Sequence, residues 1–304
     1  MLNLIVNRLG QSLLVMFGVS ALIFFSLHIT GDPAALMMPP GSSQQEIDRF
    51  RHSMGFDRPL FWQYGHYLSG ILHGDFGESL RYSQPVLSLI AERLPATALL
   101  AVSALAWSSV LGLLLGIVSA LRPHGPLDLL CRLLAFSGQA IPVFWLGLLM
   151  ILLFSLRLQW LPSGGYGTFA ALIMPAISLG AFYMSAVARL ARASLLEVLQ
   201  TDYIRTARAK GLSAWRIVVR HGLRNALIPV ITVQGMYFAS LLGGALVTEI
   251  IFSWPGIGRL AIQAIQNRDF PLVQAIVLLA ALVFVAINLI IDLLYLALNP
   301  RIRL

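Results

Sequence analysis

Six long stretches without a charged side chain constrain this chain more than any other feature. They lie at 9–31, 94–121, 133–156, 158–188, 225–248 and 270–291. Each exceeds the roughly 20 residues with which a helix crosses about 30 Å of hydrocarbon. Hydrophobic residues make up 58% of the chain and charged residues 11%, far from the mix of a soluble domain. Because backbone groups in lipid must bond internally, and strand-like alternation is missing, we expect an all-α polytopic membrane protein with six transmembrane helices.

The basic residues predict how these helices are oriented. With six crossings, both termini and the segments 122–132 and 189–224 share one side, which carries 13 of the 21 basic residues. The opposite side has one long loop with five arginines against seven acidic residues. The positive-inside rule therefore places both termini in the cytoplasm, and it also accounts for the basic pI of 10.2 without a nucleic-acid partner.

This topology divides the chain into four parts. Residues 1–31 form an N-terminal segment with the first membrane helix, and 32–93 form an external loop. Residues 94–298 contain the other five helices and a cytoplasmic segment at 195–224, and 299–304 form a cytoplasmic tail.

The external loop has helical signals of its own. A polar run from Ser42 to Met54 suits a helix, and apolar residues between Leu60 and Leu72 recur at helical spacing. Turn residues follow at 75–77 and 83–85. We expect a small cap with short helices. No third ligand joins His66 and His73 at metal-binding spacing, so no metal site is predicted.

Catalytic motifs are missing from the sequence. A phosphate-binding loop needs a lysine after glycine, but the only lysine, Lys210, follows Ala209. No G-x-S-x-G, H-E-x-x-H or C-x-x-C occurs, and the single cysteine, Cys131, excludes an internal disulfide. An enzyme is therefore not expected. An ion-coupled secondary transporter or channel is the alternative of another class, although the six windows lack the Asp, Glu, Lys and Arg side chains that such carriers usually need.

The most distinctive polar segment is Asp202–Pro229, which holds Lys210 and five arginines. Tyr203–Lys210 suits a short helix, and Gly211 suits the left-handed residue that ends it. Ser213 is a candidate N-cap for a second helix. That helix would carry two separate faces, one with Trp215, Val218, Val219 and Gly222 and the other with Arg216, Arg220 and Arg224. The pattern fits either a helix pair lying on anionic lipid or a docking element for a cytoplasmic protein.

The same segment resembles the coupling motif of permease subunits in binding-protein-dependent ABC importers, whose general pattern is E-A-A-x-x-x-G-x₉-I-x-L-P. Aligned on Gly211, only Ala207, the glycine and Leu223 match it literally. However, DYIRTARAKGLS followed by HGLRNALIPVIT is similar to the variant in the first, or B-type, permease subunit of dipeptide, oligopeptide and nickel importers. The likeness continues in GFDRPL, GDFGES, RLPAT, EIIFSWPGIGRL, NRDFPLVQA and NPRIR, in order along the whole chain.

This resemblance implies a type I ABC importer permease fold in a bacterial inner membrane. It implies a second, homologous permease, two cytoplasmic ATPase subunits that carry ATP and Mg, and a periplasmic or lipid-anchored solute-binding protein. No cofactor is implied in this chain. The loop 32–93 would contact the binding protein or cover the pathway.

Residue roles carried over from the family are limited to two groups. The ATPase contact would consist of Tyr203, Arg205, Thr206, Ala207 and Gly211, and the pathway would be lined by Gly235, Gly243 and Gly244 in the fifth helix. Small peptides, including dipeptides, oligopeptides and glutathione-like peptides, are the first expectation for the substrate. Nickel or another metal–chelator complex is the alternative for the same machinery.

Overall fold

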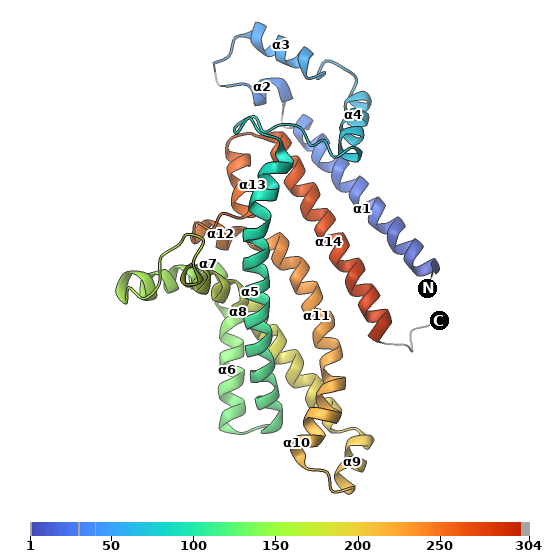
Figure 1. Ribbon diagram of the computed structural model, residues 1–304, viewed down its shortest axis with the longest axis vertical. Coiled ribbons are helices and arrows are strands. Elements are labelled where there is room, and N and C mark those ends of the chain that lie inside the picture. The colour runs from blue at the N-terminus through green and yellow to red at the C-terminus, as the bar shows by residue number, and fades with distance from the viewer. Residues whose placement is uncertain (1, 30, 40, 299–304) are drawn as a thin grey trace. The chain divides into compact units, whose positions relative to one another are not determined.

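The computed structural model describes residues 2–29, 31–39 and 41–298, and this part of the chain is almost entirely helical (Figure 1). Its one β-type pairing is an isolated bridge between Glu78 and Pro85. The chain forms two compact units, Met1–Pro95 with Gly256–Ala286, and Ala96–Pro255 with Ile287–Leu304. The expected all-α class is confirmed.

The first unit contains four helices from the N-terminal third and one from the C-terminal third. They are α1 (Leu2–Ile29), α2 (Pro33–Met37), α3 (Gln44–Ser53), α4 (Leu60–Leu72) and α13 (Ile257–Gln266). The start of α5 (Val86–Leu121) and most of α14 (Phe270–Leu298) also belong to it.

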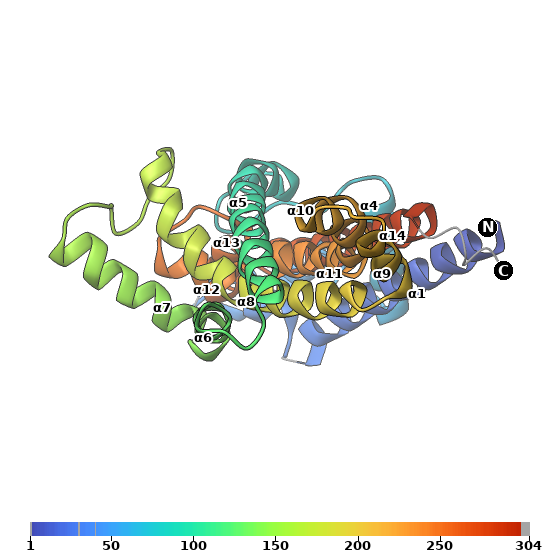
Figure 2. The same ribbon diagram turned by 90° about the horizontal axis from the view of Figure 1, so that it is seen from below.

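The second unit contains the rest of α5 and a series of long and short helices. They are α6 (Pro126–Ala140), α7 (Val143–Met150), the π-helix η1 (Ile151–Arg157), α8 (Phe169–Leu199), α9 (Asp202–Ala209), α10 (Ala214–Arg216), the π-helix η2 (Ile217–Gly222), α11 (Leu223–Gly244) and α12 (Leu246–Ile251). Seen from below in Figure 2, α9 and α10 lie next to one end of α11.

Three helices among the described residues are long and apolar enough to cross a membrane: Val86–Leu121, Phe169–Leu199 and the Phe270–Ile291 part of α14. A fourth span results if α6 and the α7–η1 helix are counted together, although they are bent by 103°. The window 133–156 is thus not the straight helix that we expected. The bend has a local cause: Ile141 is held extended at φ −93° and ψ 122° by the proline that follows it, and Pro142 begins the next helix.

The helices of the segment 32–93 form where the sequence predicts them. Ser43 and Glu46 make a reciprocal capping box that starts α3, and α4 covers the apolar run from Leu60. α4 packs on α1 through a 2.9 Å hydrogen bond between the Tyr64 and Ser20 hydroxyls. This loop segment is therefore anchored on the first apolar helix.

A buried carboxylate joins two of the sequence motifs in the first unit by hydrogen bonds. Asp269, in NRDFPLVQA, is fully buried and accepts a hydrogen bond from the hydroxyl of Ser79, in GDFGES. The backbone amides of Leu80 and Arg81 also donate to Asp269, at 3.3 and 3.4 Å. An apolar cluster around Val86 and Leu272 packs beside this network. The end of the segment 32–93 is consequently part of the core of this unit.

Close backbone contacts hold α6 against α8 in the second unit. A Cβ added to Gly138 of α6 would lie 2.4 Å from the carbonyl oxygen of Ala181 in α8. The EIIFSWPG motif supplies two of the largest fully buried side chains, Phe252 and Trp254. The Trp254 indole donates a 2.8 Å bond to the carbonyl of Ala96, so this motif serves the packing of the unit.

Candidate functional site

The short helix α9 is the best-defined element of the basic segment. It begins at Asp202 and ends at Ala209, one residue from the predicted bounds at each end. Gly211 has φ +76°, and its amide donates to the Arg208 carbonyl at 3.0 Å. The Leu212 amide donates to Ala207 at 3.3 Å, which completes a Schellman motif. The predicted helix stop at Gly211 is confirmed, with its physical cause.

One face of α9 is buried against the segment that follows. Ile204 is fully buried and Ala207 nearly so, and both pack with Ile217 and partly buried Leu212. Ala207 therefore contributes a small side chain that permits close packing. The opposite face exposes Arg205 and Thr206. Of the five residues proposed for the partner contact, the structure leaves these two, with Tyr203 and Gly211, on the surface.

Tyr203 connects α9 to the start of α11. Its hydroxyl accepts a 2.8 Å hydrogen bond from the Asn225 side-chain amide and lies 3.3 Å from the His221 carbonyl, to which it donates. The same residues line a cavity of about 530 Å³ together with Arg220 and Arg224. The side of α9 that carries Tyr203 is therefore bonded directly to a long apolar helix and faces a cationic cavity.

The second helix of this segment differs in length and type from the regular α-helix that the sequence predicts. α10 has only three residues and continues directly into η2. Ser213 occupies the N-cap position but makes no side-chain capping bond. Val218 and Gly222 are buried whereas Trp215 and Val219 are exposed, so these four residues do not share one buried face. The wider π-helical turn changes the 3.6-residue spacing on which that prediction relied.

Comparison with known proteins shows which family the chain belongs to. Residues 112–304 match the family described as "Binding-protein-dependent transport system inner membrane component", and residues 1–101 match the N-terminal component of the same systems. This chain belongs to that family of ABC importer permeases. The resemblance noted from the motifs, to the dipeptide and oligopeptide group, is thereby confirmed.

Characterised relatives of this permease match it over its full length. The glutathione transport system permease protein GsiC of Escherichia coli K12 is 43% identical over 304 residues, which is 100% of this chain and 99% of that protein. GsiC of Shigella flexneri serotype 5b has the same identity and coverage. These relatives are permease proteins, which agrees with a transport subunit and not with an enzyme.

Solved structures show the fold that this permease shares. A chain of the MetNI methionine ABC transporter in an inward-facing conformation superimposes with a TM-score of 0.59 at 20% identity, covering 70% of this chain and 97% of that one. An amino acid ABC transporter crystallised with histidines gives a TM-score of 0.55 at 16% identity, covering 69% and 94%. At these identities the likeness concerns the fold alone.

The pathway glycines predicted for this permease have different surroundings. A Cβ on Gly235 would lie 2.6 Å from Cγ1 of Ile291, so this glycine allows α11 and α14 to pack closely. Gly243 and Gly244 end α11, and their surroundings lie outside the described residues. A role for the three glycines in the pathway stays a prediction.

The sequence did not indicate the burial of two acidic side chains: Asp128, which lies in none of the quoted motifs, and Glu249, the first residue of EIIFSWPGIGRL. Asp128 is fully buried and bonds to Ser119 and Arg192, from the neighbouring helices α5 and α8. Glu249 is also fully buried and accepts a 2.6 Å bond from Thr97. The signal for Asp128 was its position as the one acid in the short segment 122–132; burial itself could not be read from the sequence.

Proposed function

We propose that this chain is the permease subunit that forms, with a second homologous permease, a membrane pathway for small peptides. Two cytoplasmic ATPases that bind ATP and Mg power the transport, and a solute-binding protein delivers the peptide. The chain crosses the bacterial inner membrane six times with both termini in the cytoplasm, if α1, the bent α6–η1 pair and α11 are counted as spans beside the three long apolar helices. Family membership supports this assembly.

The observation that carries the proposal is the anchoring of α9. A docking helix transmits movement only if it cannot rotate independently of the membrane helices. Ile204 fixes α9 through burial, and the Tyr203 hydroxyl fixes it through two hydrogen bonds toward η2 and α11. Arg205 and Thr206 remain exposed on the other face. A force applied to that face of α9 is therefore transmitted directly to α11.

The substrate proposal rests on relatives. Full-length identity of 43% to a glutathione permease supports a small peptide as the transported solute. A metal–chelator complex carried by the same machinery is the second candidate, since the sequence motifs are shared with nickel importers. Uptake into proteoliposomes containing both permeases and both ATPases separates these candidates, with glutathione, a dipeptide and a nickel chelate offered in turn.

Cross-linking tests the docking face directly. Cys131 is the chain's single cysteine and is buried, so Thr206→Cys creates a uniquely exposed thiol. We expect this thiol to cross-link to an ATPase subunit. Arg157→Cys, also exposed but on η1, is the matched control and should not cross-link. Equal cross-linking from both positions, or from neither, contradicts the docking assignment.

Energy dependence tests the class of transporter. Peptide uptake by the complete complex should require ATP hydrolysis and persist when ion gradients are collapsed. Uptake by this chain alone, driven by a proton or sodium gradient, would instead establish the ion-coupled alternative.

A further inference from the structure

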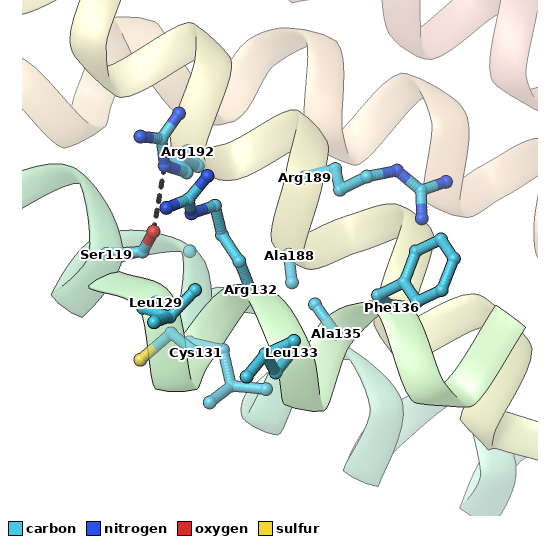
Figure 3. Close-up of a pocket in the computed structure, with 12 residues that line it drawn as sticks. Ser119, Leu129, Cys131, Arg132, Leu133, Ala135, Phe136, Ala188, Arg189 and Arg192 are labelled. Atoms are coloured by element: carbon cyan, nitrogen blue, oxygen red, sulfur yellow. Dashed lines mark hydrogen bonds between the residues drawn. The ribbon is translucent and has the colours of Figure 1, made fainter. Parts of the chain in front are cut away.

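A second pocket is formed without any residue of α9, and it differs from the first in its largely apolar lining. It has a volume of about 450 Å³ and is lined by residues of α5, α6 and α8 (Figure 3). Three charge-free windows have one of their boundaries at this pocket. The window 94–121 ends just beyond Ser119, the window 133–156 begins just after Arg132, and the window 158–188 ends just before Arg189. Helices long enough to span hydrocarbon thus place it at a membrane–water boundary.

The inner wall of the pocket is a fully satisfied charge pair. Arg192 donates to Asp128 in a two-point arrangement, with Nε 3.1 Å from Oδ1 and one terminal nitrogen 3.2 Å from Oδ2. The Ser119 hydroxyl and the His124 amide also donate to this carboxylate. Because Asp128 is fully buried, its charge is compensated within the protein, and it has no free oxygen to offer a ligand.

The pocket carries more positive than negative charge. Arg132 reaches the same carboxylate only at 3.4 Å and is 52% exposed. Arg189 is exposed on α8, and Figure 3 shows it at the end of the pocket where Phe136 lies. The lining thus includes three arginines, with the single carboxylate of Asp128 behind two of them, so the formal charge of these four side chains is +2. Arginine is the side chain that best matches the geometry of a phosphate group.

The remaining lining is apolar and open to the outside. Leu129, Leu133 and Phe136 of α6 are each more than half exposed, and they follow one another along the pocket. A free anion would gain nothing from this surface. A molecule with a phosphate at one end and a hydrocarbon chain at the other satisfies both parts of the lining.

We propose that this pocket binds an anionic phospholipid, with its headgroup between Arg132 and Arg189 and an acyl chain along α6. Basic pockets between membrane helices at the cytoplasmic boundary are suited to such headgroups. The bound lipid would fill the groove between α6 and α8 next to the Asp128–Arg192 pair. The proposal is independent of the docking role of α9.

Binding of a soluble, short-chain phosphatidylglycerol to the full-length chain in neutral detergent tests it. Wild type should bind this lipid more tightly than phosphatidylcholine of the same chain length. The double variant Arg132→Gln/Arg189→Gln should bind phosphatidylglycerol about 30-fold more weakly, since each arginine near a membrane surface contributes about 1 kcal/mol to anionic lipid binding. The charge-preserving variant Arg132→Lys/Arg189→Lys should retain most of the affinity. Arg157→Gln removes an exposed arginine elsewhere and should bind like wild type.

Three results would overturn the proposal. Equal affinity of wild type for the two lipids shows that charge plays no part. An unchanged affinity of the double variant shows that the lipid sits elsewhere. Inorganic phosphate displacing the lipid at comparable concentration shows a site for a free anion. If the double variant fails to fold, Arg189→Gln alone leaves the Asp128 network intact and should still weaken binding about 5-fold.

Discussion

Gly211 offers a sharp test of how α9 is held. With φ +76° it lies in the left-handed region, and a Cβ added there would meet nothing within 4 Å. Substitution is therefore costly because of the backbone conformation and not because of side-chain size. A non-glycine residue in this conformation costs about 1–2 kcal/mol, asparagine is tolerated better than alanine, and a β-branched residue is the worst.

This cost acts on the C-terminal end of α9. Both Schellman bonds, from Gly211 to Arg208 and from Leu212 to Ala207, require the left-handed residue. A penalty of 1–2 kcal/mol raises the opened population of this end about 5- to 30-fold. We predict that opening increases in the order Gly, Asn, Ala, Val at this position.

Hydrogen exchange on the full-length chain measures the opening directly, through peptides that cover 202–212. The informative comparison is Gly211→Asn with Gly211→Ala, because asparagine is larger but should exchange more slowly. If exchange instead increases with side-chain volume, the conformational argument is refuted. In the complete transporter, peptide uptake should decrease from Gly through Asn and Ala to Val. Retention of uptake by Gly211→Val would contradict a docking role for a rigid α9.

Two further predictions concern packing and acid stability. Gly138→Ala forces a Cβ to within 2.4 Å of the Ala181 carbonyl and should destabilise the protein by about 1–3 kcal/mol, measured by thermal unfolding; Gly65→Ala, in a helix with open space around the glycine, is the control and should be neutral or stabilising. The hydrogen bond from Arg51 lowers the pKa of Asp32, so the pair stabilises the fold above the unfolded pKa of about 4, and this contribution is lost as the pH falls further through the folded pKa. In Arg51→Gln this contribution is absent, so the free energy of unfolding should fall less than in wild type when the pH is lowered below about 4. An unchanged acid unfolding profile would show that the pair contributes nothing.

Several local features could be read correctly before any fold was known. A helix was expected within the polar run from Ser42 to Met54, and α3 spans Gln44–Ser53. The bounds of α9 followed from a polar helical run and a glycine. Such features depend on residues within one or two turns, so the information that determines them is local.

Other features required the packed structure. The sequence pattern predicts one straight helix over 133–156, but the structure bends there by 103°. The π-helical turn of η2 has no signal in residue spacing. The exposure of the predicted contact residues also depends on packing: Ala207 is buried in a cluster with Ile204 and Ile217, whereas Arg205 and Thr206 are exposed.

The sequence by itself determined the helical class, the family and the position of α9, because charge-free length, turn residues and ordered motifs are properties of the chain. Tertiary structure alone decided which polar residues meet. Asp128 pairs with Arg192, 64 residues away, and Asp269 with Ser79, 190 residues away. Removing a carboxylate from water is tolerable only when the fold brings such donors to it, and no local pattern encodes that meeting.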